Sequence, residues 1–225
     1  MTWDVFDRQA GRYDAWFDSA AGSRLFAAEL ECLASLLPSD VSGWTEVGVG
    51  TGRFAAALGI SKGVDPSPPM LKKAEERGIS TEEAQAEQLP YESDSVAGIL
   101  LVVTLCFLDQ PEAALRECVR VLKPGGKLLA GIVPAESSWG QFYQEKGNAE
   151  HPFYSVARFY TCRETKELAS NAGLELVSAA STLPMPPGEN VANIRVRDGA
   201  RESFGFAAMM FRMRDGNKPP QSEQV

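Results

Sequence analysis

The chain has 225 residues, with 22 basic and 30 acidic side chains and a formal net charge of −8. An acidic chain without clustered lysine and arginine is a poor partner for nucleic acid, because phosphate binding needs concentrated positive charge. No run of about 18 apolar residues is present to cross a membrane, and the first residues lack the basic and apolar regions of a signal peptide. The sequence therefore predicts a cytoplasmic protein that binds neither nucleic acid nor membrane.

The first part of the chain predicts short strands that alternate with helices. Apolar residues recur at helical spacing over residues 24–37, and Pro38 follows the last of them. Ser67, followed by two prolines, predicts the start of a later helix. The predicted strands are 44–47, 63–65 and 80–83, and the predicted helices between them are 53–58 and 67–77.

The alternation continues further along the chain. Strands are predicted at 98–103 and 127–133 around an amphipathic helix at 111–122, and a helix at 163–172 precedes strands at 174–183 and 203–214. Strands and helices joined by short loops predict a mostly parallel α/β sheet that is covered on both faces. We expect residues 1–215 to form one domain and the polar segment 216–225 to be a disordered tail.

A glycine-rich turn lies between the first two predicted strands. Gly48, Gly50 and Gly52 follow Glu46, and Asp65 ends the second strand 19 positions after Glu46. Glycines let the backbone turn sharply and approach a ligand closely. An acid at the end of such a strand can accept both hydroxyls of a ribose. The pattern predicts a nucleoside-bearing cofactor.

The residue after the turn distinguishes among nucleoside cofactors. A dinucleotide-binding turn needs a small residue at the position where this chain has Arg53, and a phosphate-binding P-loop needs a Lys-Ser/Thr pair that does not occur here. A nicotinamide-dependent oxidoreductase is therefore the disfavoured alternative.

Further segments follow in the order typical of one enzyme family. They are residues 13–17, the Glu-x-Gly-x-Gly-x-Gly turn at 46–52, residues 86–91 with 93–96, the strand at 98–103, and the turn and strand at 122–129. Together they resemble class I S-adenosylmethionine-dependent methyltransferases, in particular the ubiquinone/menaquinone-type (methyltransferase type 11) branch that acts on small molecules. The resemblance covers about residues 5–133. It implies a doubly wound, Rossmann-like sheet of about seven strands with an antiparallel C-terminal edge hairpin.

The resemblance also implies S-adenosylmethionine as the cofactor and suggests which residues hold it. Glu46 and the turn residues Gly48, Gly50, Thr51 and Gly52 would hold its amino-acid end. The other implied cofactor residues are Asp65 at the ribose; Ser67, Met70, Ala86 and Glu87 around the adenine; Val103 and Thr104 at the end of the fourth strand; and Tyr13 over the methyl group.

Several of these residues have a simpler structural interpretation. Glu46 could cap a turn, Asp65 could only initiate the next helix, and Tyr13 could anchor the N-terminal helix to the core. The chain also departs from the family where Gln85 and Ala97 replace the usual acids. These two departures keep open the alternative of a non-catalytic, cofactor-binding regulatory protein.

Residues 134–160 are rich in aromatic side chains and show neither helical nor strand periodicity. A long irregular segment in a compact domain is usually a lid or a binding element, so we expect it to cover the substrate. His151, the only histidine, and Tyr143 are the candidate catalytic residues, since imidazole titrates near neutral pH. A solvated histidine and an aromatic packing layer are the alternatives. An aromatic pocket would suit a flat or amine-bearing small-molecule acceptor.

The four cysteines are Cys32, Cys106, Cys118 and Cys162, and none of them shows C-x-x-C spacing. We expect reduced thiols and no metal site.

Overall fold

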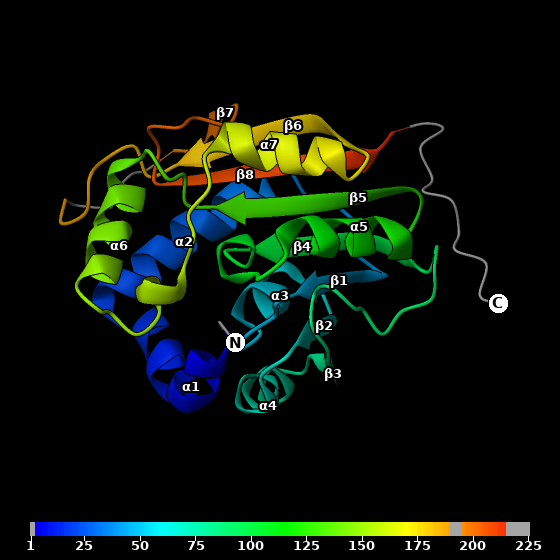
Figure 1. Cartoon of the computed structure of the whole chain (residues 1–225), viewed down its shortest axis with the longest axis horizontal. Helices are drawn as coiled ribbons and strands as arrows, with labels where there is room; N and C mark the ends of the chain where they lie inside the picture. Colours follow the sequence, from blue (N-terminus) through cyan, green and yellow to red (C-terminus); the bar gives the residue numbers. More distant parts are fainter. Residues whose placement is uncertain (1–2, 190–194, 215–225) are drawn as a thin grey trace.

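The structure is a computed structural model and describes residues 3–189 and 195–214. An eight-stranded sheet runs through this part of the chain in the order β3-β2-β1-β4-β5-β8-β6-β7 (Figure 1). Its parallel strands are β1 (Trp44–Val47), β2 (Lys62–Asp65), β3 (Ser80–Glu83), β4 (Val96–Val102) and β5 (Leu122–Ile132).

The last strands are antiparallel. β8 (Phe206–Met213) lies between β5 and β6 (Leu174–Thr182) and is antiparallel to both. The short strand β7 (Arg197–Asp198) pairs with β6 and extends the edge of the sheet. The predicted α/β sheet with an antiparallel C-terminal pair is confirmed, although β8 is an inner strand of the sheet and not its edge.

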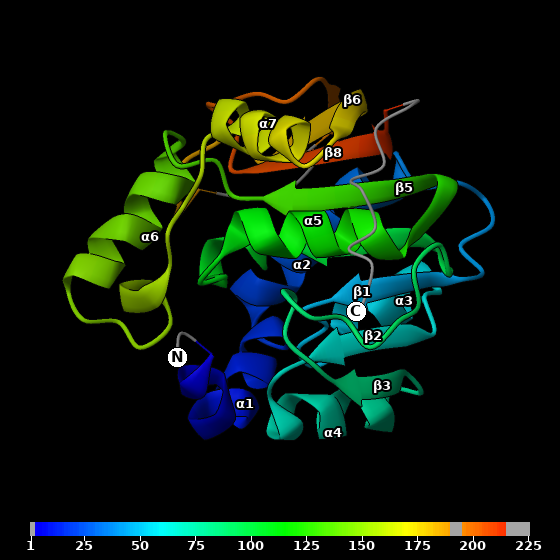
Figure 2. The same cartoon turned by 45° about the vertical axis from the view of Figure 1, so that its right-hand side comes forward.

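Helices cover both faces of the sheet, as the two views of Figures 1 and 2 show. On one face lie α5 (Pro111–Val121) and α7 (Cys162–Asn171), and on the other lie α2 (Ala20–Ala34), α3 (Arg53–Leu58) and α4 (Pro68–Glu76). Ile99 and Leu101 of β4 pack with the first group, whereas Leu100 packs with the second. Burial of the strand on both faces explains why its sequence is continuously apolar.

Two further helices lie beyond the carboxyl ends of the parallel strands. They are α1 (Asp4–Phe17) and α6 (Ser138–Asn148), both on the side toward which the β5 arrow points in Figures 1 and 2. At the start of α6, the Ser137 hydroxyl accepts a hydrogen bond from the Gly140 amide at 2.9 Å. A short 3₁₀ turn, η2 (Tyr154–Val156), follows.

The prediction that residues 134–160 lack regular structure is therefore wrong. Within α6 only Trp139 and Gly140 are buried, so the helix has no continuous apolar stripe that a periodicity search would detect. The predicted helix at 24–37 also begins earlier, because the Ser19 hydroxyl accepts a hydrogen bond from the Gly22 amide at 3.0 Å and starts α2 there.

Ion pairs fix the second half of α1 to the helices that follow the first two strands. Asp14 is buried and lies 2.7 Å from the Arg53 guanidinium and 2.9 Å from that of Arg77. Arg53 also pairs with the exposed carboxylate of Asp18 at 2.9 Å. Arg53, which departs from the dinucleotide-binding motif, thus links α3 to α1. At Gln9 the backbone of α1 is non-helical (φ −129°, ψ 18°), which divides the helix into two halves.

In residues 3–189 and 195–214, no helix combines the length and the apolar character that crossing a membrane needs. The predicted disordered tail at 216–225 lies outside the described residues.

Candidate active site

The glycine turn is held against β2 by backbone hydrogen bonds. The amides of Gly48 and Val49 donate to the Val64 carbonyl at 2.8 and 2.9 Å. Gly48 has φ +71°, and a Cβ added there would collide with Thr104. Gly50 has φ +51°, but the nearest atom to an added Cβ is in the Tyr13 ring, 4.0 Å away. A side chain at Gly48 would thus clash with Thr104, whereas a side chain at Gly50 would project into open space beside the turn.

Asp65 fixes the geometry around the end of β2. Its carboxylate accepts hydrogen bonds from the amides of Gly50 and Ser67, both at 2.9 Å. Burial raises the pKa of Asp65 to about 6, while these two amide donors act in the opposite direction. Each carboxylate oxygen can accept a second hydrogen bond, so Asp65 can still bind a ligand hydroxyl.

A cavity of about 250 Å³ opens at the carboxyl ends of β1, β2 and β4. Nine of the predicted cofactor residues lie on its wall: Tyr13, Gly48, Gly50, Asp65, Met70, Ala86, Glu87, Val103 and Thr104. The nine predicted cofactor residues come from five separate segments of the chain and lie at one cavity.

Four predicted residues lie away from the cavity wall. Glu46 is buried and accepts a hydrogen bond from the Ala55 amide at 2.8 Å, so it caps the first turn of α3. Burial holds the pKa of Glu46 well above its usual value. Thr51 hydrogen-bonds the carboxylate of Asp14, and a Cβ on Gly52 would collide with α4. The Ser67 hydroxyl is buried without a hydrogen-bond partner in the described chain.

Some wall residues were not predicted. They are Trp3, Phe6, Pro66, Ala84, Val102 and the segment 107–110, together with Gln85, which replaces an acid that is usual in the family. Residues 107–110 follow the carboxyl end of β4, so their position in the chain could have indicated them. Trp3 and Phe6 carry no motif, and only the packing of α1 reveals them.

Val103 adds backbone strain to the wall. It has φ +51°, a conformation that β-branched residues rarely adopt. Its amide donates to the Gly131 carbonyl at 2.8 Å, which holds the strained backbone in place. Strained residues concentrate at functional sites, so Val103 supports the assignment of this cavity as a binding site.

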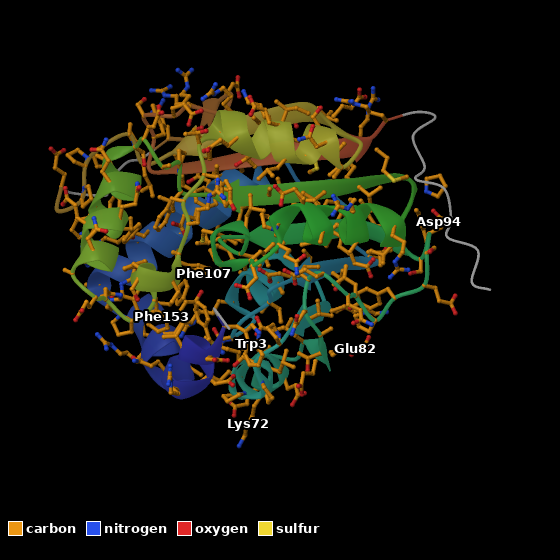
Figure 3. All side chains as sticks on the ribbon, in the orientation of Figure 1. Trp3, Lys72, Glu82, Asp94, Phe107 and Phe153 are labelled. Atoms are coloured by element: carbon orange, nitrogen blue, oxygen red, sulfur yellow. The ribbon has the colours of Figure 1, made fainter. Side chains whose placement is uncertain are left out.

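Aromatic rings close the cavity on the side of α1. The ring of Phe6 contacts Phe107 at a centroid distance of 5.0 Å and Phe153 at 5.2 Å, and Tyr13 contacts Phe153 at 5.8 Å. We call Phe6, Tyr13, Phe107 and Phe153 the aromatic roof. In Figure 3, Trp3, Phe107 and Phe153 lie on this side of the molecule, whereas Lys72 of α4 points away from it.

A second group of rings extends from the roof toward α6. His151 stacks on Tyr154 and Tyr154 on Tyr143, each at 4.5 Å, and Tyr143 stacks on Phe159 at 6.1 Å. We call these four residues the aromatic stack. Burial lowers the pKa of His151 and raises that of Tyr154 to about 12. The two predicted catalytic residues, His151 and Tyr143, thus lie in this stack and not on the cavity wall.

Of the four thiols, only that of Cys106 contacts a residue of the cavity wall. Cys32, Cys118 and Cys162 are buried and free, and burial raises the pKa of each to about 12. Cys106 is also free, and it donates a hydrogen bond to the Val103 carbonyl at 3.3 Å. All four are therefore neutral thiols near pH 7.

The sequence and the fold of the chain match known proteins. Residues 45–130 match the model of the methyltransferase domain family. A protein of Thermotoga maritima, described as an SAM-dependent methyltransferase and "possible histamine N-methyltransferase", is 36% identical; the match covers 95% of this chain and 100% of that one with a TM-score of 0.87.

Two sequence relatives extend this comparison. An uncharacterized protein of Mycobacterium tuberculosis is 37% identical over 203 residues, which is 90% of this chain and 71% of the relative. A ubiquinone/menaquinone biosynthesis C-methyltransferase of Brucella abortus is 34% identical over 145 residues, covering 56% of this chain and 53% of the other. The chain belongs to the class I S-adenosylmethionine-dependent methyltransferases. It is an enzyme of this class with S-adenosylmethionine as its cofactor, which replaces the nicotinamide-dependent alternative.

Proposed function

We propose that the enzyme transfers the methyl group of S-adenosylmethionine to a small-molecule acceptor, in a site formed by residues 1–215 acting as one domain. The observation that carries this proposal is the cavity at the carboxyl ends of β1, β2 and β4, on whose wall Gly50 and Asp65 lie together. Bound S-adenosylmethionine supplies a carbon that is already electrophilic. The protein then has to orient the acceptor and exclude water.

The cavity wall suggests which side chains hold the cofactor. We assign the ribose hydroxyls to Asp65, because its carboxylate lies on the wall with acceptor capacity left. We assign the adenine to the space between Met70 and the segment 84–87, and the amino-acid end to the turn around Gly48 and to Thr104. Glu46 and Ser67 support this wall from behind and do not belong to it.

Replacement of Asp65 by alanine tests the cofactor assignment. We expect binding of S-adenosylhomocysteine, measured by calorimetry, to weaken by about 2–4 kcal/mol, because ligand hydroxyls lose a charged acceptor. The melting temperature should also fall, since the amides of Gly50 and Ser67 lose their partner. Asp40→Ala is the matched control: Asp40 accepts the Ser42 amide at 2.8 Å in an exposed turn. Unchanged affinity in the Asp65 variant would refute its role.

The acceptor side lies beyond the aromatic roof. We propose that residues 134–160, which include α6, form the lid over the acceptor, and that the acceptor is aromatic or bears an amine. The stacked rings of Tyr143 and Tyr154 support this proposal, because such faces bind flat or cationic groups. The description of the Thermotoga maritima relative as a possible amine methyltransferase agrees with it. The free thiols support a reducing, cytoplasmic location.

Replacement of His151 by alanine tests the lid. We expect turnover to fall while affinity for S-adenosylhomocysteine stays nearly unchanged, because His151 contacts Tyr154 and is not on the cavity wall. Tyr143→Phe, which keeps the ring, should retain more activity than Tyr143→Ala if ring stacking is what matters. A pH–rate profile shows whether His151 is also a base: in that case its loss removes a titration below about pH 6.5. Parallel loss of cofactor affinity and turnover would refute the lid.

A further inference from the structure

Helix α2 carries a carboxylate on its inward face. Leu25, Cys32 and Leu33 are buried against the sheet, and they mark the face of α2 that points to the protein interior. Glu29 lies four residues after Leu25 and four before Leu33, so it falls on the same face. Its side chain is only partly buried. An acid thus interrupts an otherwise apolar stripe, where a hydrophobic residue would be expected.

Among the described residues, aromatic hydroxyls interact with Glu29, and no cation there offsets the effect of burial on its pKa. The titratable groups that it affects are Tyr13 of α1, Cys32 of α2, Tyr143 of α6 and Tyr154 of η2. Within residues 3–189 and 195–214, no hydrogen bond or ion pair is formed by its carboxylate. Burial alone raises the pKa of Glu29 to about 8.

An unpaired carboxylate here is unfavourable even though part of the residue reaches solvent, because burial raises its pKa. Carboxylates removed from water are normally paired or hydrogen-bonded, because desolvation disfavours the charged form. Replacing Glu29 by a leucine would complete the apolar stripe of α2. The position of this acid is therefore explained by a positively charged partner that is not part of the described chain.

Tyr13 connects this carboxylate with the cofactor cavity. Its ring is on the cavity wall, and its hydroxyl lies in the electrostatic field of both Asp65 and Glu29. On the far side, Tyr143 and Tyr154 stack and their hydroxyls hydrogen-bond each other. A ligand between Glu29 and Tyr13 would thus lie against aromatic faces and next to the cavity assigned to the cofactor.

We propose that Glu29 binds the ammonium group of an amine acceptor, that Tyr13, Tyr143 and Tyr154 surround this group, and that the enzyme is an N-methyltransferase. This inference rests on the proposed methyltransferase function. The ion pair and the aromatic faces both favour a cation, and both are stronger when water is excluded.

The same carboxylate has a role in the reaction. An ammonium nitrogen has no lone pair, so one N–H proton must first pass to the Glu29 carboxylate. The neutral nitrogen then attacks the methyl carbon, a C–N bond forms, and the C–S bond breaks with its electron pair remaining on sulfur as a thioether. The nitrogen carries the positive charge in the methylated product, and Glu29 later releases its proton to solvent.

Glu29→Gln keeps the shape of the side chain and removes its charge. We would assay labelled methyl transfer to phenethylamine, tyramine and histamine, with 2-phenylethanol, benzoate and thiophenol as acceptors without an amine. The parent enzyme should methylate one or more of the amines and none of the others. Glu29→Gln should lose about 100-fold or more of this activity, while calorimetry shows unchanged affinity for S-adenosylhomocysteine. Glu31→Gln, on the exposed face of α2, is the matched control and should behave as the parent.

Thermal stability supplies a second readout. The folded-state pKa of Glu29 lies above its usual value, so the contribution of Glu29 to the stability of the parent should fall as the pH rises from about 4.5 to about 8. Glu29→Gln should therefore melt several degrees higher than the parent at about pH 9 and close to it at about pH 4. Adding phenethylamine with S-adenosylhomocysteine should raise the melting temperature of the parent and leave that of the variant unchanged.

The outcomes separate the two proposals. If the parent does not bind S-adenosylhomocysteine or S-adenosylmethionine, the proposed function fails. If it binds them but no amine of the panel is methylated or raises the melting temperature, the assignment of Glu29 to an amine is wrong. The assignment would also be wrong if the parent methylated only the acceptors without an amine, or if Glu29→Gln methylated the amines as fast as the parent.

Discussion

Replacement of Asp14 by alanine should lower the free energy of unfolding by about 2–3 kcal/mol, because it leaves two partly buried guanidinium groups without their buried partner. Asp14 is buried and lies within 3.0 Å of both Arg53 and Arg77, which belong to or follow two different helices. Arg77 also donates to the Thr51 carbonyl at 2.9 Å, so the same network supports the glycine turn. The variant should therefore also lose cofactor affinity.

Urea unfolding measures this effect, and Asp18→Ala is its control. Asp18 pairs with the same Arg53 but is 68% exposed, so solvent screens the pair and its loss should hardly change the stability. The ion pairs with Arg53 and Arg77 hold the pKa of Asp14 well below its usual value, although burial acts against them. Its contribution is thus complete above about pH 4 and is lost as the pH falls further. If Asp14→Ala and Asp18→Ala lowered the free energy of unfolding equally, the stabilising role of the Asp14 ion pairs would be contradicted.

Replacement of Gly50 by valine should abolish cofactor binding. The backbone there has φ +51°, which a β-branched residue rarely adopts, and the added side chain would project beside the Tyr13 ring into the cavity. S-adenosylhomocysteine raises the melting temperature of a protein that binds it, so a melting curve with and without the ligand measures the loss.

Gly78→Val is the matched control for backbone strain. Gly78 has φ +83°, and an added Cβ would have no atom within 4 Å. The control should melt at a lower temperature than the parent and still respond to S-adenosylhomocysteine. A normal ligand response in the Gly50 variant would show that the turn does not touch the cofactor.

Local patterns predicted the elements that bring the cofactor residues together. β1 (Trp44–Val47), β3 (Ser80–Glu83) and α3 (Arg53–Leu58) have the predicted bounds. Glycines mark both ends of β1 and α3, whereas β3 is polar, and parallel strands place their carboxyl ends at one edge of the sheet. This is why Gly50, Asp65 and Thr104, far apart in the chain, could be placed together before the structure was known.

The remaining features depend on packing that no local pattern encodes. Glu46 follows the family motif, yet its side chain turns toward the Ala55 amide because α3 begins directly above it. Trp3 and Phe6 reach the cavity only because Asp14 fixes α1 to α3 and α4. For Glu29 a signal was present: an acid in the stripe formed by Leu25 and Leu33 of α2.

The kink at Gln9 gives the two halves of α1 unequal strength. The half after the kink carries Asp14 and its buried ion pairs, whereas the half before it carries Phe6, which contacts the rings of Phe107 and Phe153. Each ring contact contributes only about 0.5–1.5 kcal/mol beyond the area that it buries, less than the loss of a buried ion-pair partner. We therefore expect the front half of the helix to open more readily than the back half, so that ligand exchange through this end of the site need not weaken the scaffold.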